Sequence, residues 1–237
     1  MQLEPGRRTA APGRIGYFPS PIWAEGGPAP LWREWGKGLL RPRILTIPRR
    51  RGPLSKSERD RRKKLSLNEL ARTLPDYAKD LRLNISSLLT EQLLTDQQKY
   101  GTFVACAHAC SYLPLIHAAE AEAAAKLTPE ALTAAKAAAS IMAMNNIYYR
   151  FTHLAINKEY STRPAKLRMN IIGSPGIDKA DFELFSLAVS AVNGCGMCID
   201  AHEKVLLAAG ISIDTIQTAA RIASVMHGVA RTLQAIG

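Results

Sequence analysis

Two cysteines, Cys195 and Cys198, stand two residues apart and are followed by His202. This spacing lets one helical turn bring both sulfur atoms together, so a disulfide can form and break with little backbone movement. His202 comes four positions after Cys198, which makes the two side chains neighbours on one face of a helix. An imidazole beside a thiol can accept its proton and then stabilise the thiolate as a cation. The pattern therefore predicts a dithiol redox centre.

The spacing also suggests a role for each sulfur. Cys198 has the closer relation to His202 and is the predicted nucleophile, while Cys195, at the helix entrance, is the predicted proton donor and resolving thiol. A hydroperoxide would oxidise Cys198 to a sulfenic acid, which would condense with Cys195 to a disulfide. With a disulfide substrate, thiol exchange would replace oxidation. In both cases a dithiol donor would restore the two thiols.

A carboxylate is expected near this centre. Glu183 precedes Cys195 by 12 residues, and an antiparallel helix pair joined at Asn193 and Gly194 would return it alongside the cysteines. There it could orient His202, directly or through a water, and fix the tautomer of the ring. Taken alone, Glu183 is equally compatible with a solvated helix acid.

The sequence after residue 64 predicts an all-α fold. It is rich in alanine and leucine, and its capping residues, glycines and prolines lie where helices would start and stop rather than where hairpins would turn. Thr128 is the expected N-cap of a long helix that runs toward Leu154, and Asp178 is the expected N-cap of a helix that ends at residues 193 and 194.

Two further helices follow from the same signals. The helix with the two thiols is expected over Cys195 to Ala209, with a stop at Gly210. The final helix is expected to begin near Ser212 and to run through Met226.

Comparing the chain with itself at an offset of 84 residues suggests an internal duplication. Residues 127–142 then align with residues 211–226, with matching alanine, serine and methionine positions. Under this offset Cys195, Cys198 and His202 fall on Ser111, Pro114 and Ala118. The first copy would therefore have the scaffold without the chemistry. Chance similarity between alanine-rich helices is the alternative.

Charge divides the chain into two predicted parts. Residues 1–64 hold 16 Lys and Arg against 5 Asp and Glu, a net charge of +11, whereas residues 65–237 hold 15 of each. The first part also contains nine of the 14 prolines and all three tryptophans, without a helical or alternating apolar period. We therefore predict a disordered basic leader over 1–64 and a helical redox domain over 65–237.

Several interpretations of the leader compete. The favoured one is a translation start annotated too far upstream, because Ser66 and Glu69 form a capping-box pattern suited to a protein's first helix. A targeting segment and an arm that binds nucleic acid or another polyanion are the alternatives. The chain has neither the apolar stretch of a secretory signal nor the roughly 20 apolar residues of a membrane span. Neither export nor membrane insertion is expected.

The cysteine count points to a reducing compartment. Four cysteines are too few for a disulfide scaffold of this size, which predicts a cytoplasmic protein with reactive thiols. Cys106 and Cys110 lie in an apolar stretch and are expected to pack as small hydrophobic residues. A zinc site built from all four cysteines is the alternative. The favoured interpretation has no bound metal.

Three stretches carry a resemblance to a known family. Residues 74–80 (LPDYAKD), 144–151 (MNNIYYRF) and 168–206 resemble AhpD, an alkylhydroperoxidase family within the carboxymuconolactone-decarboxylase-like superfamily. The likeness covers nearly all of residues 65–237. It implies an AhpD-like helical bundle, commonly a homotrimer, that acts as an antioxidant peroxidase and disulfide oxidoreductase. Some relatives have a histidine between the two cysteines, where this chain has Gly196 and Met197.

The resemblance also implies an electron path. In such systems electrons pass from a lipoylated acyltransferase to the AhpD-like protein and then to an AhpC-type peroxiredoxin. Dihydrolipoamide is the implied electron-donating cosubstrate, with no bound cofactor. The sulfenic acid would form on Cys198, Cys195 would donate a proton, and the family's proton relay would fall on Glu183 and His202.

Two other classes of function stay open. A non-redox enzyme resembling carboxymuconolactone decarboxylase would share the helical scaffold, although it would not need both Cys195 and Cys198. A zinc-binding or polyanion-binding protein would instead use the four cysteines or the basic leader.

Overall fold

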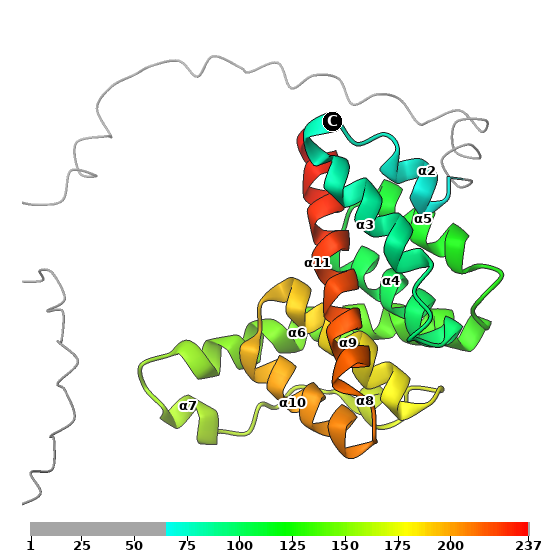
Figure 1. Ribbon diagram of the computed structural model, residues 1–237. Coiled ribbons are helices and arrows are strands. Elements are labelled where there is room, and N and C mark those ends of the chain that lie inside the picture. The colour runs from blue at the N-terminus through cyan, green and yellow to red at the C-terminus, as the bar shows by residue number, and fades with distance from the viewer. Residues whose placement is uncertain (1–64, 237) are drawn as a thin grey trace, which may run out of the picture. The chain divides into compact units, whose positions relative to one another are not determined.

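The computed structural model describes residues 65–236, and every regular element in this part of the chain is a helix (Figure 1). The predicted all-α class is confirmed. In chain order the elements are α2 (Leu67–Ala71), the 3₁₀ helix η2 (Asp76–Ala78), α3 (Lys79–Leu89), α4 (Asp96–Cys110), α5 (Leu113–Ala123), α6 (Pro129–Leu154), α7 (Glu159–Thr162), α8 (Asn170–Gly173), α9 (Lys179–Asn193), α10 (Gly196–Ala208) and α11 (Ile213–Ile236). None of these helices has the length and hydrophobicity needed to cross a lipid bilayer.

The predicted leader, residues 1–64, lies outside the described residues. Its predicted disorder, its origin in a misplaced start and its alternative roles therefore stay predictions. The capping box just after it is present: the Ser66 hydroxyl accepts a hydrogen bond from the Glu69 backbone N–H at 3.2 Å, and the Glu69 carboxylate accepts one from the Ser66 backbone N–H at 2.8 Å. This reciprocal pair begins α2.

Helices α4 and α9 form the centre of the fold. They pack against each other, and α6 and α11 pack against both. Long runs of both helices are buried, over residues 99–107 of α4 and 181–190 of α9, so their sequences are apolar on most sides rather than along one stripe. The two helices approach closely at Gly101, where an added Cβ would lie 2.1 Å from the Phe185 ring. Only glycine leaves room for that ring.

The predicted helix starts around the site are confirmed. The Thr128 hydroxyl accepts a hydrogen bond from the backbone N–H of Ala131 at 3.2 Å, which caps α6. The Asp178 carboxylate caps α9 by accepting a backbone N–H of its first turn at 2.8 Å. Helix α9 ends at Gly194, whose φ of 68° is the left-handed conformation that favours glycine.

The predicted end of the last helix is wrong. The sequence signals placed it at Met226, whereas α11 continues to Ile236. Buried apolar residues beyond Met226, among them Val229 and Leu233, continue the helical period against the core. Gly228 does not break the helix; it brings α11 close to Leu81 of α3, whose Cδ2 atom would lie 3.0 Å from an added Cβ.

The helix order repeats, as the predicted duplication requires. Helices α4, α5 and α6 begin at residues 96, 113 and 129, and α9, α10 and α11 begin at residues 179, 196 and 213, a displacement of 83 or 84 residues. The first two helices of each copy are related by 83, because Tyr112 is the N-cap of α5 as Cys195 is the N-cap of α10. The predicted counterparts are therefore corrected by one position. Cys195, Cys198 and His202 correspond to Tyr112, Leu115 and Ala119, which still provide neither a thiol nor an imidazole.

Candidate active site

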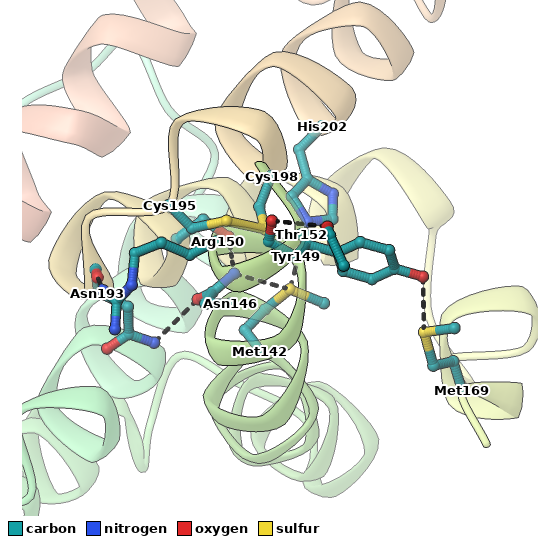
Figure 2. The surroundings of a disulfide bond; sticks show 11 residues. Met142, Asn146, Tyr149, Arg150, Thr152, Met169, Asn193, Cys195, Cys198 and His202 are labelled. Atoms are coloured by element: carbon teal, nitrogen blue, oxygen red, sulfur yellow. Dashed lines mark hydrogen bonds between the residues drawn. A yellow bond between two sulfur atoms is a disulfide. The ribbon is translucent and has the colours of Figure 1, made fainter. Parts of the chain in front are cut away.

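Cys195 and Cys198 form a disulfide at the start of α10, with their Cα atoms 5.3 Å apart (Figure 2). The left-handed Gly194 ends α9 and turns the chain into Cys195, the N-cap of α10. The backbone N–H of Cys198 donates to the carbonyl of Cys195 at 3.1 Å. One turn of chain therefore brings the two thiols together, as their spacing predicted.

The two cysteines differ in their access to a cavity. Cys195 is fully buried, whereas Cys198 is 6% exposed. Cys198 and His202 line a cavity of about 290 Å³. A small molecule in this cavity can therefore reach Cys198, while Cys195 stays behind it.

His202 and Glu183 form a buried pair. The Nδ1 atom of His202 lies 2.6 Å from the Oε2 atom of Glu183, so α9 does return the carboxylate to α10 as expected, and the contact is direct. In the tautomer with the proton on Nδ1, the ring donates this hydrogen bond to the Glu183 carboxylate. The pair fixes the orientation of the ring and leaves Nε2 as the nitrogen that can exchange a proton.

A methionine of α6 completes the surroundings of the histidine. The Sδ atom of Met142 lies 3.3 Å from the Nε2 atom of His202 (Figure 2). With the ring proton on Nδ1, Nε2 is itself an acceptor and the thioether has no proton to donate, so this contact shields the Nε2 lone pair without forming a hydrogen bond to it. The contact of Met142 with His202 bridges 60 residues, and no local pattern signals it.

The rest of the cavity wall is mostly apolar. The wall comes from α6, α8, the chain just before α8, and α10. Besides Cys198, His202 and Met142, its residues are Asn145, Tyr149, Met169, Ile172, Met197 and Ala201. None of these residues was predicted to be functional, because no short motif in the sequence marks them. A wall of this kind excludes water and favours a ligand with an apolar chain.

A polar network behind the disulfide fixes the turn between α9 and α10. The Asn146 side chain donates to the Ser190 hydroxyl at 2.9 Å and accepts from the Asn193 side chain at 2.9 Å. The Arg150 guanidinium donates to the backbone carbonyl of Asn193 (Figure 2). These bonds tie α6 to Ser190 and Asn193 in the last turn of α9, so they fix the position of the chain that leads into Cys195.

The other two cysteines lie on α4 and are free thiols. Burial raises the pKa of Cys106 well above its usual value and raises the pKa of Cys110 to about 11. Both are therefore protonated at neutral pH and pack as hydrophobic residues, as expected. Within residues 65–236, no three His, Cys, Asp or Glu side chains are grouped so that they could hold a metal ion.

Comparisons with known proteins all match this chain to one group of related proteins. Residues 158–237 match the model of the carboxymuconolactone decarboxylase family. An alkyl hydroperoxide reductase AhpD of Rhizorhabdus wittichii is 65% identical over 166 residues, which cover 70% of this chain and 96% of that protein. The AhpD proteins of Rhodopseudomonas palustris and Brucella anthropi are each 60% identical over 171 residues, 72% of this chain and 94% and 98% of theirs.

Proposed function

The chain belongs to the AhpD family of alkyl hydroperoxide reductases, and we propose that it reduces alkyl hydroperoxides with electrons from dihydrolipoamide and also passes these electrons to an AhpC-type peroxiredoxin. One observation carries this proposal. The disulfide presents Cys198, and not Cys195, to an apolar cavity that also contains the Glu183-oriented His202.

The oxidative half-reaction begins with both cysteines reduced. His202 takes the proton of Cys198, and the thiolate attacks the terminal oxygen of the hydroperoxide. A sulfur–oxygen bond forms while the oxygen–oxygen bond breaks, and the alkoxide leaves as an alcohol with the proton of Cys195. The Cys195 thiolate then attacks the sulfenic acid on Cys198. The disulfide forms, and the released hydroxide takes the proton from His202 to become water.

The reductive half-reaction uses the same exposed sulfur. A thiolate of dihydrolipoamide attacks Cys198 and releases Cys195 as a thiolate, which yields a mixed disulfide. The second thiol of the donor then releases Cys198 and leaves as lipoamide. The apolar cavity wall supports this donor, because its dithiol is attached to a hydrocarbon chain. Two sulfur atoms carry both electrons, so neither half-reaction needs a bound metal, flavin or haem.

The proposed partners follow from the family resemblance. A lipoylated acyltransferase would present the dihydrolipoyl group, and the disulfide of an AhpC-type peroxiredoxin would accept the electrons by exchange with the reduced cysteines. We propose a cytoplasmic homotrimer as the working form. The non-redox alternative lacks comparable support, because it has no use for a disulfide beside the cavity.

The test is hydroperoxide reduction driven by dihydrolipoamide, measured with and without an added AhpC-type peroxiredoxin. We expect turnover in both cases, with faster turnover when the peroxiredoxin is present. Cys198→Ser should abolish it, and Cys195→Ser should allow one oxidation of Cys198 without cycling. Cys106→Ser, on α4, is the matched control and should keep full activity. An inactive wild-type protein, or an active Cys198→Ser variant, would favour the non-redox alternative.

A further inference from the structure

The cavity beside Cys198 contains a buried polar group without a partner. Asn145 lines this cavity and is 4% exposed, and its Oδ1 atom is covered by neighbouring protein atoms without accepting a hydrogen bond from any of the described residues. The next residue, Asn146, is fully buried but uses both ends of its amide, on Ser190 and Asn193. Burying an unpaired carbonyl costs stability, and such a group in a native fold calls for a functional reason.

The position of Asn145 on α6 suggests what its partner is. Met142 lies three residues before it and Tyr149 four residues after it, so all three share the face of α6 that lines the cavity. Met142 contacts His202, and the Tyr149 hydroxyl lies 3.9 Å from the sulfur of Met169. The unpaired acceptor of Asn145 therefore lies in an otherwise apolar wall near the reactive sulfur. A matching ligand has an apolar chain and one hydrogen-bond donor.

We propose that Asn145 binds the hydroperoxide group of the substrate, with its amide turned about the Cβ–Cγ bond so that Oδ1 faces the cavity and accepts a hydrogen bond from the terminal O–H. This assignment rests on the proposed function. The alkyl chain then lies along the methionines of the cavity, and the oxygen held by Asn145 is the one that the Cys198 thiolate attacks. That oxygen ends on sulfur, the other leaves as the alcohol with the Cys195 proton, and sulfur loses the two electrons that the peroxide gains. The thiol of a reducing cosubstrate is a much weaker donor than O–H, so it satisfies this carbonyl less well.

Asn145→Leu separates the two half-reactions, because leucine keeps the approximate size and removes the acceptor. Reduced protein is mixed with cumene hydroperoxide and the rate of disulfide formation is followed; oxidised protein is mixed with dihydrolipoamide and the rate of reduction is followed. We expect oxidation to slow about tenfold or more, as for loss of one oriented hydrogen bond. Reduction should change less than twofold, and the melting temperature should stay the same or rise. Asn84→Leu, an exposed asparagine on α3, is the matched control.

Each other outcome overturns the inference. Unchanged oxidation would show that Asn145 does not bind the peroxide, and slower reduction alone would assign it to the thiol donor. Slowing of both steps with a lower melting temperature would make it a structural residue. If the leucine variant does not fold, the same two rates are measured on Asn145→Ala, whose smaller side chain cannot overfill the cavity. If reduced wild-type protein does not react with the hydroperoxide at all, the proposed function itself fails.

Discussion

The two sulfur atoms of the site are not equivalent. Cys198 borders the cavity and lies one helical turn before His202, whereas Cys195 is fully buried where α10 begins. A substrate therefore meets Cys198 first, and Cys195 can react only with what is already bound to its neighbour. This asymmetry makes Cys198 the proposed nucleophile and Cys195 the proposed resolving thiol.

Glu183 is a positioning residue in this account, since it acts through His202. Glu183→Gln should slow hydroperoxide reduction about 10- to 100-fold, the usual cost of losing a partner that orients a reactive imidazole. The neutral amide supports the imidazolium less well, so the thiolate of Cys198 is less stabilised and the pKa of that thiol rises. The profile of Cys198 alkylation rate against pH should therefore move to higher pH.

Two further variants sharpen that measurement. His202→Phe should move the alkylation profile in the same direction and further, because it removes the cation itself. Glu203→Gln, at an exposed position on α10, should leave the profile unchanged. A Glu183→Gln variant with wild-type rates and profile would remove the carboxylate from the mechanism.

Packing between helices α4 and α9 holds the site's scaffold. In Gly101→Ala the new Cβ would lie 2.1 Å from the Phe185 ring, so the ring or a helix must move. We expect a loss of about 1–3 kcal/mol in the free energy of unfolding, the usual range for overpacking a core. Thermal denaturation measures it. Gly173→Ala, where nothing lies within 4 Å of the added atom, is the control, and equal stability of the two variants would contradict the close packing.

The thiols of α4 should be inert in the folded protein. Burial raises the pKa of Cys110 to about 11, so at pH 8 roughly one molecule in a thousand has this thiol ionised. Raising the pH toward that pKa increases the thiolate fraction and should accelerate alkylation. Iodoacetamide at pH 8, followed by peptide mass analysis, should label Cys106 and Cys110 far more slowly than in unfolded protein. Equal labelling in the folded and unfolded protein would contradict their burial.

Local signals made most of the helix framework predictable. The caps at Thr128 and Asp178 and the left-handed Gly194 each act within a few residues, so the sequence alone indicates where α6 and α9 begin and where α9 ends. The pairing of Cys195 with Cys198 follows from spacing for the same reason. The end of α11 was missed, because it depends on burial of residues such as Leu233 against distant helices and not on a stop signal.

Contacts between distant helices were not predictable. Met142 contacts a histidine 60 residues away, and methionines in helices usually pack in cores, so its position beside His202 has no sequence signature. Asn145 and Asn146 are adjacent and chemically identical, yet only Asn146 is fully paired. That difference arises from the side of α6 that each one faces. Glu183 lies between these cases, since the sequence placed it beside His202 but left open whether the contact is direct or through a water.

Only one half of the duplicated scaffold carries the chemistry. The place of Cys195 is taken by Tyr112 in the first copy, and the place of His202 by Ala119. The first copy therefore contributes packing, chiefly through α4, and one wall of the cavity through α6, while the second contributes both thiols and the histidine. The cavity needs both copies, because Met142 comes from α6 and Cys198 from α10.

The basic leader should not affect catalysis. Residues 1–64 carry the entire net charge of +11 of the chain, whereas the site residues all belong to the neutral remainder. A protein lacking residues 1–64 should reduce alkyl hydroperoxides with kcat and KM within about twofold of the full chain, because this segment provides none of the site residues and salt screens the field of its charges. A large loss of turnover in the shortened protein would contradict our interpretation of this segment.

The most direct test of the central claim is a mass measurement of the two cysteine peptides through one redox cycle. Fully reduced protein receives one equivalent of an alkyl hydroperoxide, then an excess of dihydrolipoamide, with thiol trapping and peptide mapping after each step. We predict that the peroxide links Cys195 to Cys198 with loss of two hydrogen atoms and leaves Cys106 and Cys110 unlinked, and that the dithiol reverses the link. A protein whose Cys195 and Cys198 stay reduced with the peroxide, or whose disulfide dihydrolipoamide does not reopen, would contradict the account.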